Sequence, residues 1–213
     1  MRAVRPPFFF RLLSPKLWTC EIPGREKVIY LTFDDGPVPE VTPGILKILQ
    51  QFGIRATFFV VGDNVRKHPD LFSELISAGH SIGNHTFHHL NGWKISPAAY
   101  AEDVFRCNEL VKTNLFRPPY GRFTPSQYLL LRKHFNFILW SVLTYDFDPH
   151  QTPESCLNAA ISNSGPGSVV VFHDSLKAAG NVMYALPRFL EHFQGKGYRF
   201  EGLNYKAPSS AKL

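Results

Sequence analysis

The sequence predicts an α/β fold in which about seven parallel strands alternate with helices and close into a (β/α) barrel. Three observations predict it. From Lys27 onward, β-rich runs alternate with helix-like stretches, some of the runs are apolar on both faces, and four helix starts share one signal. The chain has 213 residues, 44% of them hydrophobic, which suits one domain with a substantial core.

Seven segments have the composition of strands, being rich in β-branched and aromatic residues. Runs such as "VVVF" and "FILW" are apolar on both faces, as expected of strands covered by helices. With this many alternating units, a barrel is favoured over an open sheet. The predicted strands are 27–33, 56–61, 80–84, 114–118, 135–142, 167–173 and 198–203.

Helices are predicted between these strands, and most of their starts place a hydroxyl residue before a proline. The hydroxyl can cap the first turn, and proline is tolerated at the first helical position. These starts are Thr42-Pro43, Ser96-Pro97, Thr124-Pro125 and Thr152-Pro153. The predicted helices are 43–52, 69–78, 97–113, 125–134, 153–163 and 182–193.

Residues 1–26 are predicted to be an N-terminal amphipathic leader, and residues 27–213 the folded domain. The leader begins with basic residues, but its apolar part is too short for a membrane span and lacks a convincing cleavage site. We expect it to pack on the domain, or alternatively to touch a membrane surface. A cytoplasmic or membrane-peripheral location is favoured, and the oligomeric state is left open.

The charge pattern argues against a nucleic-acid partner. The formal net charge is +6, but Arg2, Arg5, Arg11 and Lys16 account for four of these charges in the leader. Elsewhere basic and acidic residues are interleaved, with no basic helix or Arg-aromatic array. The three cysteines, Cys20, Cys107 and Cys156, have no metal-site or disulfide spacing and are expected to be buried thiols.

Ionisable side chains recur where the predicted strands end. In a parallel α/β barrel these ends lie on one rim, where reactive residues collect. The residues found there are Asp34 and Asp35, His85, His88 and His89, Arg117 and Tyr120, Asp146 and Asp148, and His173 and Asp174.

His85 and His89 stand four residues apart in "GNHTFHHL", so one helical turn would point both imidazoles the same way. Asp35 could supply a third, oxygen ligand. Two histidines and one carboxylate with open positions favour a single catalytic divalent ion, with zinc preferred and Co²⁺ or Ni²⁺ as alternatives. His88 would point elsewhere. A structural role is expected for His68, His80, His134, His150 and His192.

If Asp35 binds the ion, its neighbour Asp34 remains as a carboxylate that takes a proton from water made more acidic by the ion. Arg117 could hold Asp34 ionised through a charge-assisted pair. His173 is the natural general acid, and Asp146 is the carboxylate that orients it.

Taken together, "TFDDGP", "HTFHH", "RPPYG" and the "FH" after an apolar strand resemble the polysaccharide deacetylases of carbohydrate esterase family 4, the NodB-homology domain. The resemblance covers about 27–203. It implies a distorted (β/α) barrel, so that 27–213 would be a catalytic domain, and an enzyme that hydrolyses the amide bond of N-acetyl groups in aminosugar polymers.

The resemblance also implies roles for particular residues. Asp34 would be the general base with Arg117 as its partner, and Asp35, His85 and His89 would be the metal ligands. The backbone N–H of Tyr120 would help to stabilise the oxyanion. His173, supported by Asp146, would protonate the leaving amine.

Two motifs depart from the family pattern. Leu143 replaces an acid and Phe147 replaces a tryptophan in the fourth motif, and Val171 replaces a leucine in the fifth. Phe147 and Val171 are expected to line the pocket for the acetyl methyl group, so the substrate preference of better-matching members does not transfer directly.

Four functions are considered from the sequence, and hydrolysis of a phosphate ester at a two-metal site is disfavoured because ligands for only one ion are found. The favoured one is a metal-dependent N-deacetylase acting on N-acetylglucosamine glycans such as peptidoglycan or chitin oligomers. The same site could serve an O-acetyl esterase on xylan or a similar glycan. A non-catalytic glycan-binding module is disfavoured because every proton-transfer and ligand position is filled.

Overall fold

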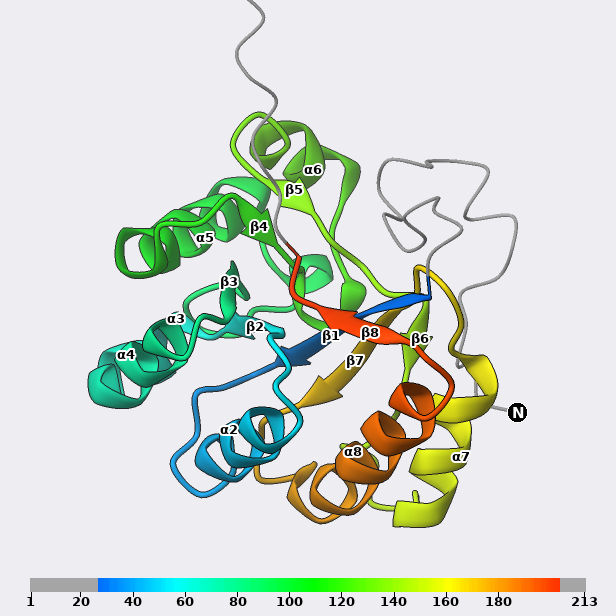
Figure 1. Ribbon diagram of the computed structural model, residues 1–213. Coiled ribbons are helices and arrows are strands. Elements are labelled where there is room, and N and C mark those ends of the chain that lie inside the picture. Colours follow the sequence, from blue (N-terminus) through cyan, green and yellow to red (C-terminus); the bar gives the residue numbers. More distant parts are fainter. Residues whose placement is uncertain (1–26, 204–213) are drawn as a thin grey trace, which may run out of the picture.

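All the strands of the computed structural model, which describes residues 27–203, run parallel in one curved sheet. Their order is β5-β4-β3-β2-β1-β7-β6, and β8 lies beside the first half of β1 (Figure 1). The strands are β1 (Val28–Asp34), β2 (Thr57–Val60), β3 (Ser81–Asn84), β4 (Leu115–Phe116), β5 (Asn136–Phe137), β6 (Val142–Leu143), β7 (Val169–His173) and β8 (Arg199–Glu201).

Within residues 27–203 no pairing joins β5 to β6, so the curled sheet does not close there. A curled parallel sheet that is covered by helices and open between β5 and β6 is a distorted (β/α) barrel, so the predicted fold class is confirmed. The segment 135–142, predicted as one strand, forms the two short strands β5 and β6 instead. Between them, the carbonyl oxygens of Ile138 and Leu139 accept hydrogen bonds from the guanidinium of Arg117 and take no part in a ladder.

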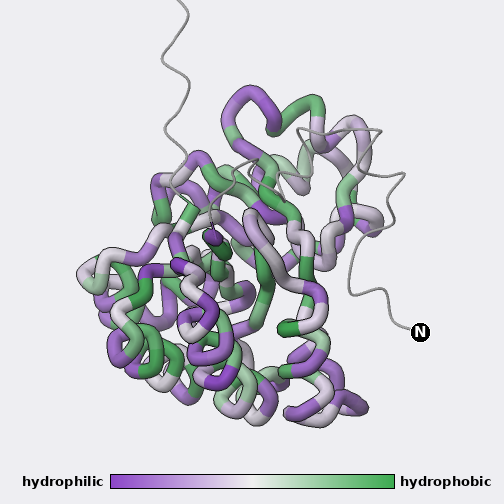
Figure 2. The backbone as a smooth tube through the Cα atoms, turned by 45° about the vertical axis from the view of Figure 1, so that its right-hand side comes forward, coloured by the Kyte–Doolittle hydropathy of each residue, from purple (hydrophilic) through white to green (hydrophobic). Residues whose placement is uncertain are grey.

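Helices cover the outer face of the sheet (Figure 1). They are α2 (Thr42–Gln51), α3 (Gly62–Lys67), α4 (Pro69–Ser77), α5 (Pro97–Val111), α6 (Pro125–Leu131), α7 (Pro153–Asn163) and α8 (Ala179–Gln194), with short 3₁₀ turns η1 (Gly92–Lys94) and η2 (Pro119–Gly121). Hydrophobic and hydrophilic residues alternate along the outer helices, as expected of helices with one buried face (Figure 2). The short helix α3 is not foreseen by the sequence patterns.

Three of the four predicted hydroxyl caps are present. Ser96, Thr124 and Thr152 each accept a hydrogen bond from a backbone N–H in the first turn of α5, α6 and α7. The prediction for Thr42 is wrong: α2 has no side-chain cap, and the Thr42 hydroxyl donates to Asp174 Oδ2 at 2.8 Å instead. A tertiary contact with the site therefore replaces the local cap.

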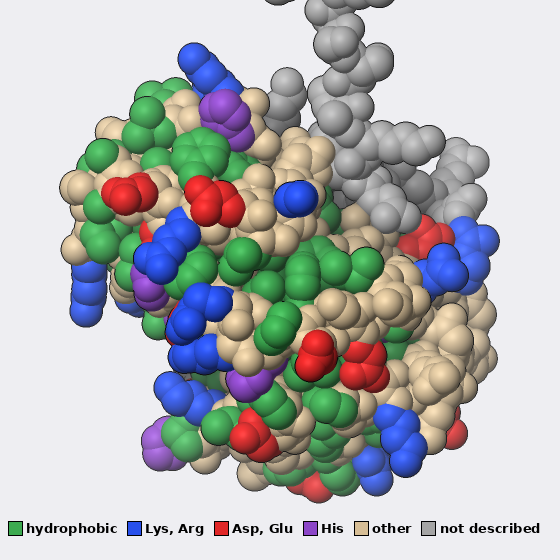
Figure 3. Space-filling model, turned by 90° about the vertical axis from the view of Figure 1, so that its left-hand side faces the viewer, with side chains coloured by type: hydrophobic (Ala, Val, Ile, Leu, Met, Phe, Trp, Pro, Cys, Tyr) green, Lys and Arg blue, Asp and Glu red, His purple; other side chains and the backbone are tan. Residues whose placement is uncertain are grey.

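The core lies between the sheet and its helices, and its centre is aromatic. Phe33 of β1 stacks on Phe58 of β2, with ring centroids 4.9 Å apart, and also faces Phe172 of β7. Because β1 is buried along nearly its whole length, the backbone that leads to Asp34 is fixed by packing on both sides. The outer surface is mixed in charge, and on the face shown in Figure 3 Lys and Arg side chains are interspersed with Asp and Glu.

Candidate active site

β1 ends in the Asp34–Asp35 pair, and the chain then turns sharply. Asp35 has a positive φ of 87°, a conformation unusual for a residue with a side chain. The turn is held from β7, because Asp174 Oδ1 accepts from the backbone N–H of Gly36 at 2.9 Å. Asn64 of α3 donates to the carbonyl of Asp35 at 2.8 Å. Two neighbouring elements therefore fix the turn.

Asp34 is paired with a fully buried arginine. Arg117 Nη1 lies 2.7 Å from Asp34 Oδ1 and also donates to the hydroxyl of Thr32 at 2.8 Å. The guanidinium lies over the ring of Phe59, 4.1 Å from its centroid. The predicted pairing of Asp34 with Arg117 is thus present in the structure. Hydrogen bonds from Nε, Nη1 and Nη2 hold the guanidinium in one orientation.

Asp35, His85 and His89 come together beside this pair. Their ligand atoms all lie within 4.8 Å of one another, with 3.1 Å between His89 Nε2 and Asp35 Oδ1. The predicted helical turn that would align the two histidines is wrong, because residues 85–90 form an irregular loop in which Thr86 and His89 have positive φ. The side chains of Asn84 and Thr86 bond to backbone N–H groups within this loop and compete with a helical ladder.

A buried acid from another element also shapes this loop. Asp103 of α5 accepts from the backbone N–H groups of Phe87 and His88, at 2.8 and 3.0 Å, with one carboxylate oxygen. Its other oxygen contacts His88 Nδ1. His88 therefore points away from the predicted ligand set, as the sequence suggests, and ties the loop to α5.

The donor set has the chemistry that a divalent first-row ion requires. His85 Nδ1 donates to the carbonyl of Arg117 at 2.7 Å, which leaves Nε2 with its lone pair facing Asp35. Burial lowers the pKa of His85 to about 4, so this imidazole is neutral near pH 7. Burial opposes ionisation of Asp35, but His89, His173 and His85 together lower its pKa below the usual value. The neutral imidazole of His85 and the ionised carboxylate of Asp35 suit zinc or a similar ion.

His173, at the end of β7, is held by both oxygens of one carboxylate. Its Nδ1 donates to Asp146 Oδ1 and its backbone N–H to Asp146 Oδ2, each at 2.7 Å. Asn181 of α8 donates to the carbonyl of Asp146. Burial favours the neutral ring, but the charge and hydrogen bond of Asp146, with help from Asp35 and Asp34, outweigh it and raise the pKa of His173 to about 9.

A cleft of about 850 Å³ joins these groups. It is lined by Asp34, Asp35, Val38, Val61, Asn64, His85, His89, Tyr120, Arg122, Trp140, Leu143, Tyr145, Phe147, His173, Ser175, Leu176 and Lys177. Tyr120 lies in its wall, with its ring 4.7 Å from that of His89. Phe147 meets the ring of His173 edge-on at 4.8 Å.

One part of the predicted acetyl pocket is wrong. Val171 is fully buried in β7 and does not line the cleft, whereas Leu143 does. Val171 pairs with Thr32 and Leu143 in the sheet, below the end of the strand, so its side chain belongs to the barrel interior. Phe147 and Leu143 both line the cleft, and Phe147 contacts the ring of His173.

Left-handed backbone conformations gather around the cleft. Asp35, Thr86, His89, Tyr120 and Tyr145 all have positive φ although none of them is glycine. Such conformations are disfavoured for residues with a Cβ and persist only where the surrounding structure fixes them. Their concentration on one rim makes this cleft a candidate functional site.

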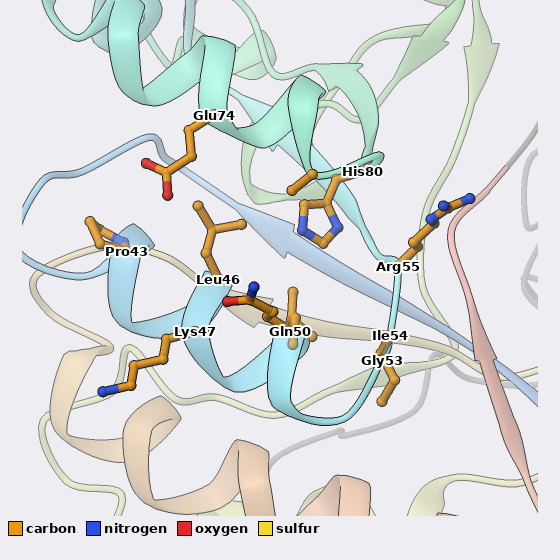
Figure 4. Close-up of a pocket in the computed structure, with 11 residues that line it drawn as sticks. Pro43, Leu46, Lys47, Gln50, Gly53, Ile54, Arg55, Glu74 and His80 are labelled. Carbon is orange, nitrogen blue, oxygen red and sulfur yellow. The ribbon is translucent and has the colours of Figure 1, made fainter.

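A second cavity, of about 490 Å³, lies between α2 and α4 on the outside of the barrel. Figure 4 shows Lys47 and Gln50 on α2, Glu74 on α4 and His80 around it. His80 is engaged in the fold, because its Nδ1 accepts from the backbone N–H of Ala56 at 3.1 Å. Among residues 27–203 the Asp35, His85 and His89 group is the one cluster with metal-ligand geometry, so the first cleft is the candidate active site.

Four residues that shape the site are not assigned a role by sequence reasoning: Asp103, Asn64, Asn181 and Asp174. Asp174 follows His173 in "FHDS", so its position at a strand end is a usable signal. Burial raises the pKa of Asp174 to about 7, although its bonds to Thr42 and Gly36 oppose the shift. The other three lie in helices far along the chain from their partners, and no local pattern marks them.

No helix in the described residues is long and apolar enough to cross a membrane. The predicted leader 1–26, with its proposed membrane contact, lies outside the described part of the chain.

Comparison with known proteins supports a common ancestry for this arrangement. The profile of the polysaccharide deacetylase family matches residues 21–134. The peptidoglycan-N-acetylglucosamine deacetylase of Bacillus cereus is 33% identical over 202 residues, covering 88% of this chain and 93% of its own. The chitooligosaccharide deacetylase of Azorhizobium caulinodans is 32% identical over 163 residues, covering 72% of this chain and 76% of its own.

The fold agrees with the same group of proteins. A crystal structure of the Bc1960 peptidoglycan N-acetylglucosamine deacetylase, bound to 4-naphthalen-1-yl-N-oxidanyl-benzamide, superposes with a TM-score of 0.85 and 30% identity. The superposition covers 93% of this chain and 95% of the other. Sequence and fold therefore point to one family.

Proposed function

The chain belongs to the polysaccharide deacetylase family, and from that membership and the geometry of the cleft we propose that it removes N-acetyl groups from N-acetylglucosamine units of a glycan with the help of a divalent metal ion. One observation carries the proposal. A carboxylate pair, a three-residue ligand set that includes one of the pair, and a histidine held by a third carboxylate all lie at one cleft. That is the set of groups required to hydrolyse an amide bond.

Asp35, His85 and His89 would hold the ion, for which zinc is the proposed identity. When bound, a divalent ion supplies Lewis-acid polarisation of the acetyl carbonyl and lowers the pKa of nearby water toward neutrality. The ionised Asp35 and the neutral His85 are already in the protonation states that binding requires.

Asp34 acts as the general base. It accepts a proton from the water that attacks the acetyl carbonyl carbon, and the ion pair with Arg117 holds the carboxylate in position. The backbone N–H of Tyr120 is assigned to the oxyanion that develops on the carbonyl oxygen. The cleft position of Tyr120 supports this assignment.

His173 acts as the general acid. Its raised pKa keeps the ring protonated near pH 7, and its Nδ1 is occupied by Asp146, so Nε2 carries the proton that can be given away. When the C–N bond breaks, this proton passes to the leaving nitrogen. The products are acetate and a free amino sugar.

The proposal is tested by acetate release from chito-oligosaccharides, peptidoglycan and acetylated xylan, with zinc-loaded protein. We expect release from an aminosugar substrate, loss of release after chelation, and recovery when zinc is added back. Asp34→Asn serves as the inactive control. Release that continues after verified metal removal would contradict metal dependence. Release from acetylated xylan alone would contradict N-deacetylation and identify an O-acetyl esterase.

A further inference from the structure

An exposed tryptophan lies just outside the cleft, in the loop between β3 and α5. The side chain of Trp93 is 65% exposed, the largest exposure among the large hydrophobic residues of the described chain. Single exposed apolar residues are common and need no explanation. Trp93 differs because the structure holds its ring in one place.

Two contacts fix the indole itself. Trp93 Nε1 donates to the carbonyl of Phe123 at 3.3 Å, and the guanidinium of Arg122 lies over the ring, 4.8 Å from its centroid. At the start of η1, the Trp93 backbone N–H donates to Asn91 Oδ1. The ring is therefore ordered although most of its surface faces solvent.

The loop that carries Trp93 is also locked. The buried side chain of Gln127 donates to the carbonyls of Gly92 and Ile95, at 2.8 and 3.3 Å, and completes the capping box of α6 with Thr124. A Cβ placed on Gly92 would lie only 2.5 Å from the carbonyl oxygen of Arg122, so the two loops touch through their backbones. Because ring and loop are already ordered, a ligand that stacks on the indole loses little side-chain entropy.

Trp93 is linked to the active site by an unbroken series of side-chain contacts. The ring of His89 packs against Tyr120, Arg122 lies 5.9 Å from the Tyr120 centroid, and the same guanidinium covers Trp93. Tyr120 and Arg122 both line the cleft. The series therefore leads from the proposed metal site, along the cleft wall, to the exposed indole.

From these contacts we infer that Trp93 and Arg122 form an outer subsite for a further sugar unit of the glycan whose reacting unit occupies the cleft. The apolar face of a pyranose ring would stack on the indole, and the guanidinium would donate hydrogen bonds to the hydroxyl, acetamido or carboxylate oxygens of that sugar. This inference rests on the proposed function for the identity of the glycan. It predicts that affinity increases with chain length because of Trp93.

Binding is measured by calorimetric titration of the full chain with N-acetylglucosamine oligomers of two and five sugars. All proteins carry Asp34→Asn so that the ligand is not consumed. With Trp93→Ala added, we expect affinity for the five-sugar oligomer to fall about tenfold, the size expected for one aromatic contact, and affinity for the two-sugar oligomer to change less than about twofold. Trp93→Phe should retain most of the affinity. Ile76→Ala, an exposed apolar residue of α4 that does not line the cleft, is the matched control and should bind both oligomers normally.

An equal effect of Trp93→Ala on both oligomers, or no effect on either, would overturn the outer subsite. So would the absence of any binding of the five-sugar oligomer. Acetate release by the wild-type protein tests the proposed function separately. If release is absent but the length-dependent loss is found, deacetylation fails and the outer subsite stands.

Discussion

Asp146 holds His173 through both of its carboxylate oxygens, one on the ring Nδ1 and one on the backbone N–H, each at 2.7 Å. The first contact sets the charge of the ring and the second sets its position. Because the acid is fully buried at the end of the sheet, solvent screens neither contact.

This pair predicts a pH dependence of folding in the metal-free protein. The pKa of His173 is raised from 6.5 to about 9 in the folded chain, so its stabilising contribution is fully present below about pH 6.5 and lost as pH rises through about 9. Asp146→Asn removes the charge and should remove this loss. The free energy of unfolding in urea, measured at pH 6 and pH 9.5 for the wild type and Asp146→Asn, tests this prediction. Titration of the His173 ring by NMR gives its pKa directly. An equal decline in both proteins would contradict the assignment.

Substitution should separate the roles of the two neighbouring acids, Asp34 and Asp35. Asp34→Asn should lower kcat by about 10²- to 10⁴-fold, the range for a general base, while zinc affinity is retained. Asp35→Asn should weaken zinc binding itself. Zinc titration and acetate release of both variants, measured side by side, distinguish the roles. Loss of zinc binding in Asp34→Asn would show that the roles are exchanged or shared.

Arg117 is expected to matter for stability as well as for catalysis. Arg117→Met leaves Asp34 buried without its partner, which should lower the free energy of unfolding by about 3–5 kcal/mol. The matched control is the exposed pair of Arg66 and Asp63, for which Arg66→Met should cost less than about 1 kcal/mol. Denaturant unfolding measures both. Similar losses from the two variants would contradict the importance of burial.

Gly36 should tolerate no side chain. A Cβ there would lie 1.8 Å from Asp174 Oδ2, so Gly36→Ala must displace either the Asp174 carboxylate or the turn that carries Asp35. We expect weaker zinc binding and a lower melting temperature. Gly180→Ala in α8, where a Cβ meets nothing within 4 Å, should be neutral or stabilise by up to about 1 kcal/mol. Unchanged zinc affinity in Gly36→Ala would show that the turn adapts.

Lys112 offers a stabilising change outside the site. It ends α5 with a φ of 47°, a conformation that favours glycine. Lys112→Gly should raise the free energy of unfolding by about 0.5–1 kcal/mol and leave acetate release unchanged. Tyr120→Gly would relieve similar backbone strain but remove a cleft wall, so its stability and activity should change in opposite directions. Thermal unfolding and activity assays of both variants test the contrast.

Local patterns were sufficient to predict most of the barrel. Runs rich in apolar and β-branched residues mark β1, β2 and β7. A serine or threonine followed by a proline marks the starts of α5, α6 and α7. The prediction was wrong where a distant partner decides. Arg117 bonds to the carbonyls that lie between β5 and β6 in the segment 135–142. The hydroxyl of Thr42 bonds to Asp174 and does not cap α2.

The candidate site follows the same rule. Residues at strand ends could be found from the sequence because a parallel barrel gathers those ends on one rim. The ligand loop could not, because its shape depends on Asp103, which is contributed by a helix about sixteen residues away and carries no sign of this role in its own segment. Spacing alone suggested a helical turn for His85 and His89, whereas Asp103 and the side chains within the loop hold it in an irregular form.

The two rims of the barrel differ in the residues that adopt positive φ angles in their turns. On the rim away from the cleft, left-handed turns are made mostly by glycines, at Gly53, Gly79 and Gly197. Around the cleft most of them are made by residues with side chains, at Asp35, Thr86, His89, Tyr120 and Tyr145, and Gly121 is the exception. Moving this site to another scaffold would therefore require transplanting whole loops together with the neighbours that enforce their dihedral angles. Placing the same ligands on relaxed backbone would reproduce the composition of the site without its geometry.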